Sequence, residues 1–126
     1  MTNLERLWMS RNQIIDVTPV ENLKRLDTLV LGRNRIVDVT PIGGLITLGR
    51  LFLDHNEIAD LTPLFSLPNL YILWLHENRI EDISPLVENT RLNEGDVVRL
   101  ENNPLSDLAL TEQIPALQKR GVNVRF

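Results

Sequence analysis

Apolar and polar positions along this chain recur with a fixed period of 22 residues. Counted from its first leucine, each of the first four copies has apolar residues at positions 1, 4, 6 and 11 and asparagine at position 9. The copies run over Leu4–Ile14, Leu26–Ile36, Leu48–Ile58, Leu70–Ile80 and, with a glycine at position 1, Gly95–Leu105. Their asparagines are Asn12, Asn34, Asn56, Asn78 and, after a longer step of 25 residues, Asn103. Such a period predicts a repeat architecture, in which each copy buries its apolar face only against a neighbouring copy.

Positions 4 and 6 alternate like one face of a short β-strand, whereas positions 1 and 4 alone also fit a helical stripe. The asparagine decides between the two, because a buried amide without a hydrogen-bond partner costs a few kcal/mol. In a coil the amide can bond the free backbone groups of the turn that leaves the strand, and stacked coils then form an asparagine ladder. We therefore predict strands at about Arg6–Ser10, Thr28–Gly32, Arg50–Asp54, Ile72–His76 and Val97–Glu101.

The second half of each copy predicts a short helical turn. A hydroxyl residue precedes a proline in four copies, as in a helix whose N-cap hydroxyl is followed by proline at the first helical position. These hydroxyl residues are Thr18, Thr40, Thr62 and Ser84. The apolar residues behind them that complete the core are Val20, Ile42, Leu64 and Leu86, then Leu23, Leu45, Leu67 and Leu92. Three additional residues before Leu92 explain the longer fourth step, and we place them on the convex side.

The copies resemble the bacterial 22-residue leucine-rich repeat of internalin-like proteins, whose consensus is LxxLxLxxNxIxDxxPLxxL. The resemblance covers nearly the whole chain. It implies an α/β fold, a right-handed leucine-rich-repeat solenoid with a parallel concave β-sheet and 3₁₀ or short helical turns on the convex side. It also implies a function in binding other macromolecules.

The last segment, NPLSDLALTEQIPALQKRGVNVRF, resembles the closing segment of bacterial leucine-rich-repeat domains, in which a helix and a short strand cover the exposed core. The residues themselves agree: Ser106 suits a helix N-cap, Pro115 the start of a second helical turn, and Gly121 a helix stop. The final strand is predicted from the alternation of Val122, Val124 and Phe126.

The chain of 126 residues forms one domain, and its five coils exceed the roughly three that a solenoid needs for stability. We divide it into repeats at about 4–25, 26–47, 48–69, 70–94 and 95–105 and a cap at about 106–126. At the other end no capping unit precedes the first repeat. The residues expected at this uncapped core edge are Leu7, Met9, Ile14 and Val17. We therefore expect a fragment that lacks its N-terminal cap, or a homodimer through this edge.

Composition narrows the function. The chain has no cysteine, which excludes a disulfide framework and a thiolate zinc site. It has no apolar run near the ~18 residues of a membrane span, and residues 1–10 lack the apolar core of a signal peptide. The net charge of −4 argues against nucleic acid as a partner. These observations leave the compartment open, and we expect neither membrane nor nucleic-acid binding.

Strand alternation directs positions 3, 5 and 7 to the concave face. Position 5 reads Trp8, Val30, Phe52, Trp74 and Arg99, and the spacing of strands makes its apolar part a stripe about 15 Å long. Aromatic residues dominate interface hot spots, and such patches are uncommon on monomers, although cross-strand packing alone is an alternative explanation. Our candidate ligand-binding residues are Arg6, Trp8, Val30, Arg50, Phe52, Asp54, Ile72, Trp74, His76, Arg99 and Glu101.

Charges near this stripe are sorted along the solenoid. The basic ones in the first three copies are Arg6, Arg11, Arg33, Arg35 and Arg50. The acidic ones in the last three copies are Asp54, Glu57, Glu77 and Glu101, with Arg79 and Arg99 as exceptions. Such a gradient would orient a partner of complementary charge, while chance clustering on a solvated face is the alternative.

Two histidines and two carboxylates converge at the predicted strand ends, since Asp54 and His76 share position 7 and His55 and Glu77 share position 8. These types suit zinc or nickel, but no His-x-x-x-His spacing is present, and such pairs are ordinary neighbours on a sheet. We therefore predict no metal and no other cofactor. We also predict no enzyme activity, because the Asp–His pair lacks a nearby nucleophile: Ser10 lies three coils from His76.

An aspartate column two residues before each hydroxyl residue offers a further site for an ion. Its members are Asp16, Asp38, Asp60 and Asp82. The calcium spacing Asp-x-Asp-x-Asp is absent, and capping of the turns explains aspartate there without an ion.

The sequence thus predicts a protein–protein interaction module that binds its ligand on the concave sheet. The alternatives are a structural or self-assembling repeat unit and a metal-binding protein at His55 and His76.

Overall fold

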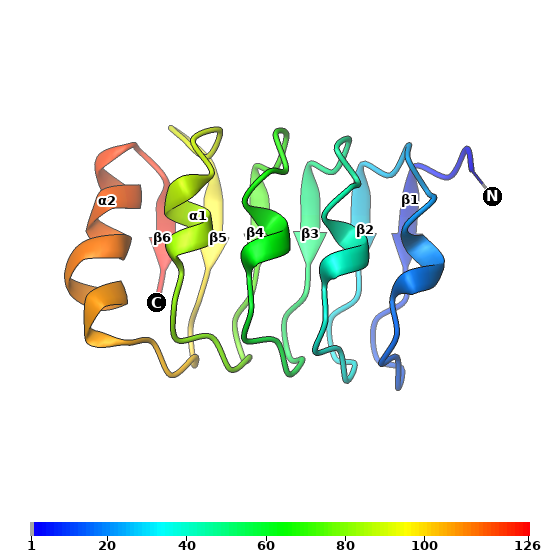
Figure 1. Cartoon of the computed structure of the whole chain (residues 1–126), viewed down its shortest axis with the longest axis horizontal. Helices are drawn as coiled ribbons and strands as arrows, with labels where there is room; N and C mark the ends of the chain where they lie inside the picture. The colour runs from blue at the N-terminus through cyan, green and yellow to red at the C-terminus, as the bar shows by residue number, and fades with distance from the viewer. Residues whose placement is uncertain (1) are drawn as a thin grey trace.

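Six short parallel strands form one sheet in the computed structural model, which describes residues 2–126. They are β1 (Arg6–Trp8), β2 (Thr28–Val30), β3 (Arg50–Phe52), β4 (Ile72–Trp74), β5 (Val97–Arg99) and β6 (Asn123–Arg125), and they lie side by side in chain order (Figure 1). Each strand pairs in parallel with the next at equivalent repeat positions, so that Leu29, for example, lies opposite Leu51. The predicted leucine-rich-repeat solenoid is confirmed.

The five predicted strands end two residues earlier than expected. Hydrogen bonds between coils nevertheless continue past them, as in the bond from the Leu31 N–H to the Phe52 carbonyl at 2.8 Å. The chain then turns at position 8, where φ lies between 55° and 60° in every copy. These left-handed residues are Arg11, Arg33, His55, Glu77 and Asn102. A left-handed residue cannot extend a strand, so the extended backbone ends before position 8.

The asparagine ladder closes this turn. The Asn56 side chain donates to the carbonyls of Leu53, in its own coil, and of Leu31, in the preceding coil, at 3.0 and 3.1 Å. Its oxygen accepts the Ile36 N–H at 3.0 Å. Asn34, Asn78 and Asn103 repeat the pattern. The predicted ladder is therefore confirmed, and it links each coil to the one before it.

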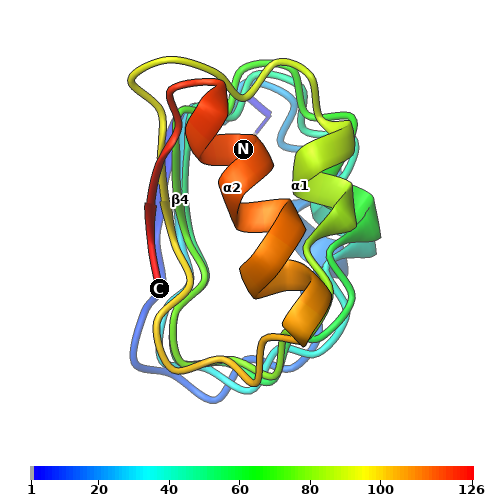
Figure 2. The same cartoon turned by 90° about the vertical axis from the view of Figure 1, so that its left-hand side faces the viewer.

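Short helical turns cover the face opposite the sheet (Figure 2). They are the 3₁₀ turns η1 (Thr18–Val20), η2 (Thr40–Ile42) and η3 (Thr62–Leu64) and the helix α1 (Ser84–Glu88). The longer fourth copy therefore carries a longer helical element on the convex side, as predicted. The apolar residues predicted to complete the core in these turns are all buried.

The predicted hydroxyl N-caps are wrong. The N-cap position of η1 is Val17, and the residues at the N-cap positions of η1, η2, η3 and α1 are apolar and form no side-chain hydrogen bond. Instead, the Thr18 N–H donates to Asp16 at 2.9 Å, and the other three aspartates of the column accept the equivalent N–H at the same distance. The Thr40 hydroxyl itself donates to Asp38 at 2.6 Å. The aspartates thus cap the turns, which was their predicted role without an ion.

The C-terminal segment closes the solenoid. A π-helical stretch, η4 (Ala109–Gln113), runs into α2 (Ile114–Lys119), and α2 lies across the end between sheet and convex turns (Figure 2). The Ser106 hydroxyl accepts the Ala109 N–H at 3.1 Å, and Gly121, at φ +89°, follows the helix as the predicted stop. Val122 and Val124 are buried, whereas Phe126 is 59% exposed.

One residue at the N-terminal edge is more deeply buried than predicted. Val17 is buried, because η2 of the next coil packs beside η1. Leu7 and Ile14 are partly buried and Met9 is exposed, and an apolar recess at this end is lined by Met9, Ile14, Val17 and Leu31, among others. Within residues 2–126 no helix covers this end as α2 covers the other. None of the helices described here is long and apolar enough to pass through a membrane.

Candidate functional site

The strand register assembles the candidate residues into columns on the concave face. Trp8 lies opposite Val30, Val30 opposite Phe52, Phe52 opposite Trp74, and Trp74 opposite Arg99. The last pair of strands adds Arg125 beside Arg99, a residue that our prediction missed. The alternation of Val122 and Val124 in the sequence could have predicted that Arg125 lies on this face. The column at position 3 reads Arg6, Thr28, Arg50, Ile72, Val97 and Asn123.

Phe52 and Trp74 form the centre of the face. Their rings meet edge to face, with centroids 4.7 Å apart and planes at 83°. The Arg99 guanidinium lies 4.9 Å from the Trp74 ring centroid, which allows a cation–π interaction. Trp74 is therefore half-buried by its neighbours, whereas Trp8 at the end of the column is 63% exposed. Both tryptophans lie outside the core, which agrees with the predicted register.

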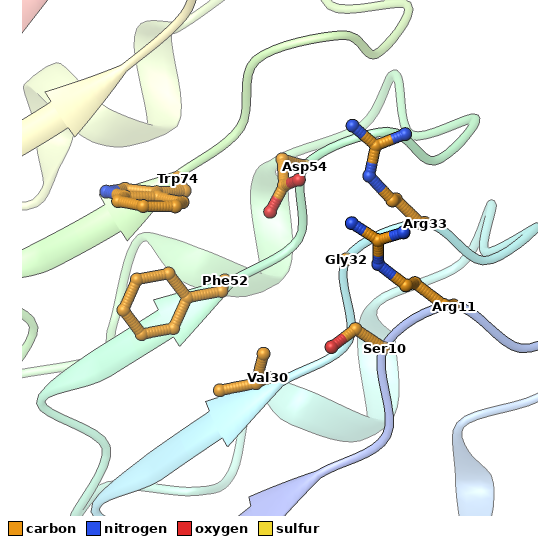
Figure 3. Close-up of a pocket in the computed structure, with 8 residues that line it drawn as sticks. All are labelled: Ser10, Arg11, Val30, Gly32, Arg33, Phe52, Asp54 and Trp74. Atoms are coloured by element: carbon orange, nitrogen blue, oxygen red, sulfur yellow. The ribbon is translucent and has the colours of Figure 1, made fainter.

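A recess of about 180 Å³ lies on the N-terminal side of this aromatic pair (Figure 3). Its lining consists of Ser10, Arg11, Val30, Gly32, Arg33, Phe52, Asp54 and Trp74. Gly32 makes room for the Asp54 carboxylate, because a Cβ at Gly32 would stand 2.6 Å from Asp54 Oδ1. Apolar side chains thus form much of the recess wall, and Arg11 and Arg33 contribute guanidinium groups to its lining (Figure 3).

A second recess, of about 230 Å³, lies on the other side of the pair. Its lining consists of Phe52, Ile72, Trp74, Val97, Arg99 and Arg125. Because Phe52 and Trp74 border both recesses, a side chain bound in either one would contact the same aromatic pair.

The arginines of this face differ in their ion pairs. Arg50 pairs with Asp27 at 3.1 Å, and this hydrogen bond lowers the pKa of the Asp27 carboxyl. Arg99 pairs with Glu101 at 2.9 Å, which likewise lowers the pKa of Glu101. Within residues 2–126, four arginines of the first two copies form no ion pair: Arg6, Arg11, Arg33 and Arg35. The positive charge of this end is therefore available to a ligand, although the whole chain is acidic.

The histidine cluster is smaller than predicted. Asp54 Oδ2 lies 2.9 Å from His55 Nδ1 and 3.8 Å from His76 Nε2. Glu77 does not join it, because its carboxylate turns to the next coil and accepts a hydrogen bond from Asn102 at 2.6 Å. Burial lowers the pKa of His76, and the positive charge of Arg99 lowers it further.

A family model described as leucine-rich repeats in two copies matches residues 2–44 and 47–88, more than half of the chain. The chain belongs to the leucine-rich-repeat family. Among solved structures, the domain is similar to internalin C2 from Listeria monocytogenes, with 40% identity, a TM-score of 0.69 and 71% of this chain covered. A second internalin from the same organism covers 98% of the chain at 26% identity and a TM-score of 0.71. The comparison with curated protein sequences gives no significant match.

A leucine-rich-repeat protein from Leptospira interrogans shares the fold, with a TM-score of 0.78 and 23% identity. The match covers 99% of this chain and 38% of the Leptospira chain. This leucine-rich-repeat chain spans 40% and 41% of the lengths of the two internalins. The resemblance to the bacterial 22-residue repeat is thus confirmed. Membership of this family supports a protein-interaction module in general terms.

Proposed function

We propose that this leucine-rich-repeat domain binds a protein ligand on its concave face, with the Phe52–Trp74 pair as the anchor. The observation that carries the proposal is that this pair borders two recesses and remains partly exposed. Partly exposed aromatic rings held rigidly by neighbours are typical of interface hot spots, because binding them costs little conformational entropy.

The charges indicate the chemistry of the ligand. Arg11 and Arg33 border the apolar recess without an ion pair among the described residues, so an apolar side chain that fills the recess would place its neighbours beside two guanidinium groups. Guanidinium groups bind carboxylates in paired hydrogen bonds. The ligand we propose is therefore a protein segment that carries an aromatic or aliphatic side chain next to an acidic residue.

Affinity capture from the native source tests this function. The wild-type domain is compared with a variant that combines Trp8→Ala, Phe52→Ala and Trp74→Ala. The control is Phe65→Ala, which removes an exposed aromatic residue at the end of η3, on the convex side. A ligand that the control retains and the triple variant loses supports the concave face. A ligand that the triple variant retains overturns the proposal.

The charge contribution has its own test. Arg33→Glu reverses one unpaired guanidinium at the recess, and Arg91→Glu reverses an exposed one outside it. The captured ligand should bind the first variant at least tenfold more weakly, and should bind the second within about twofold of the wild type, because only the first places a like charge against an acidic partner. Equal affinities would refute an acidic ligand while leaving the aromatic anchor intact.

A further inference from the structure

Three ligand-type side chains meet at the carboxyl ends of β3 and β4, beyond the aromatic anchor. The register pairs Phe52 with Trp74, so Asp54 and His76, two residues further on, face each other across neighbouring coils. His55 follows Asp54 in the left-handed conformation. One atom each of Asp54, His55 and His76 lies within 4.8 Å of the others.

We propose that Asp54, His55 and His76 bind one divalent transition-metal ion, with Zn²⁺ as the representative. Two imidazoles and one carboxylate form a ligand set that Zn²⁺ and its first-row neighbours prefer over Mg²⁺ and Ca²⁺. Three protein ligands leave at least one coordination position for water or for a group of a bound partner.

The distances fit an ion after small rotations of the side chains. Ligands around a tetrahedral Zn²⁺ at about 2.1 Å stand about 3.4 Å apart. The two separations from Asp54 Oδ2, 2.9 Å to His55 and 3.8 Å to His76, lie on either side of this value. The ion replaces the proton between Asp54 and His55, and His55 then carries its proton on Nε2 instead of Nδ1.

The state of His76 is the second observation that points to a ligand. This residue is only 9% exposed, and among residues 2–126 its Nδ1 has no hydrogen-bond partner. Its Nε2 lies 3.8 Å from Asp54, too far for a hydrogen bond. A buried polar side chain without partners is rare in folded proteins and needs a physical reason. Coordination through Nε2, the nitrogen 3.8 Å from Asp54, gives this imidazole one strong partner, while Nδ1 keeps none among residues 2–126.

The site between Asp54 and His76 is shielded from much of the solvent. The side chains of Asp54 and His76 are 15% and 11% exposed, so an ion between them is held in a partly dry site. The positive charge of Arg99, which lowers the pKa of His76, is balanced by the ion pair with Glu101. Metals bind histidine in its neutral imidazole form.

Titration of the untagged full chain with ZnCl₂ in a calorimeter tests the site, with MgCl₂ as the comparison ion. The ligand variants are His76→Gln and His55→Asn, the latter matching Asn102 at the same left-handed position. The control is Glu77→Gln, which removes a neighbouring carboxylate outside the cluster. Circular dichroism establishes that each variant is folded.

We expect one Zn²⁺ per chain, no heat from MgCl₂, at least tenfold weaker Zn²⁺ binding in each histidine variant, and binding within twofold of the wild type in Glu77→Gln. Zn²⁺ should also raise the melting temperature of the wild type and not that of His76→Gln, because an ion that binds only the folded chain stabilises it. Absence of Zn²⁺ binding at millimolar concentration, or equal binding by the wild type and both histidine variants, overturns the site. The assay needs no protein ligand, so its outcome is independent of the proposed function.

Discussion

Replacement of Asn56 by leucine removes one step of the asparagine ladder. In the folded chain the Asn56 oxygen is the only hydrogen-bond acceptor of the Ile36 N–H among residues 2–126. The carbonyls that accept hydrogen bonds from the Asn56 amide nitrogen have other donors as well. The Leu31 carbonyl also accepts from Asn34 at 2.9 Å, and the Leu53 carbonyl also accepts from Asn78 at 2.9 Å. The loss therefore falls mainly on one buried N–H group.

The magnitude follows from this count. A buried donor left without a partner costs about 1–3 kcal/mol, and each ordinary hydrogen bond removed from a carbonyl that keeps another partner costs at most about 1 kcal/mol. Asn56→Leu should therefore lower the free energy of unfolding by about 2–4 kcal/mol. Asn12→Leu is the matched control. Asn12 is exposed and, within residues 2–126, its side chain bonds only the Met9 and Ser10 carbonyls of its own coil, so its replacement should cost less than about 1 kcal/mol.

Urea unfolding followed by circular dichroism measures both variants against the wild type. With the slopes of about 1–3 kcal/mol per M that small domains show, Asn56→Leu should lower the urea midpoint by about 1 M or more. Glu57→Ala, which breaks only the surface ion pair with Arg79, should change it little. Equal midpoints for Asn56→Leu, Asn12→Leu and Glu57→Ala would refute the structural role of the ladder.

Three other predictions address the turns, the acid limit and the exposure of the tryptophans. In urea unfolding, Glu77→Gly should be at least ~1 kcal/mol less destabilising than Glu57→Gly. Each substitution removes one 2.6 Å contact, but of these two glutamates only Glu77 has the left-handed conformation that glycine adopts without strain. Equal values would contradict the argument from backbone strain. Hydrogen bonds from the Ser84 N–H and from Gln113 lower the pKa of Asp82 in the folded chain. The ionised carboxylate therefore stabilises the fold at pH values above its unfolded-state pKa. This stabilisation is lost as the pH falls through the lower pKa of the folded state. The melting temperature of Asp82→Asn should therefore fall less than that of the wild type between pH 6 and pH 3, and parallel curves would contradict this. Iodide should quench Trp8 fluorescence strongly and Trp74 fluorescence less, measured in Trp74→Phe and Trp8→Phe; full protection of both would mean that the concave register is wrong.

The periodic part of the structure could be predicted because each repeat position has one environment. In the second, third and fourth copies leucine at positions 1 and 4 is buried and asparagine at position 9 forms the same hydrogen bonds, so the strand register and the ladder followed from spacing alone. The N-caps could not be predicted in this way. Thr18 and Asp16 can each cap a turn, and only the coordinates reveal that the aspartate accepts the N–H while the hydroxyl does not.

The site was predicted less completely, because it depends on side-chain directions that periodicity does not determine. Spacing placed Phe52 beside Trp74 but did not reveal that Arg99 covers one tryptophan. It grouped Glu77 with the histidines, whereas the Glu77 carboxylate accepts a hydrogen bond from Asn102 in the next coil. The space beside Asp54 depends on the missing side chain of Gly32, which a consensus of apolar positions does not contain.

The dissociation constant of the captured ligand for Trp74→Ala tests the concave-face account most directly. Trp74 borders both recesses and lies outside the core, so its loss should weaken binding by about 2 kcal/mol or more, roughly thirtyfold, with little change in the urea midpoint. Phe65→Ala on the convex side should leave the constant unchanged. Wild-type affinity in Trp74→Ala together with weakened binding in Phe65→Ala would place the ligand on the convex side and contradict the account.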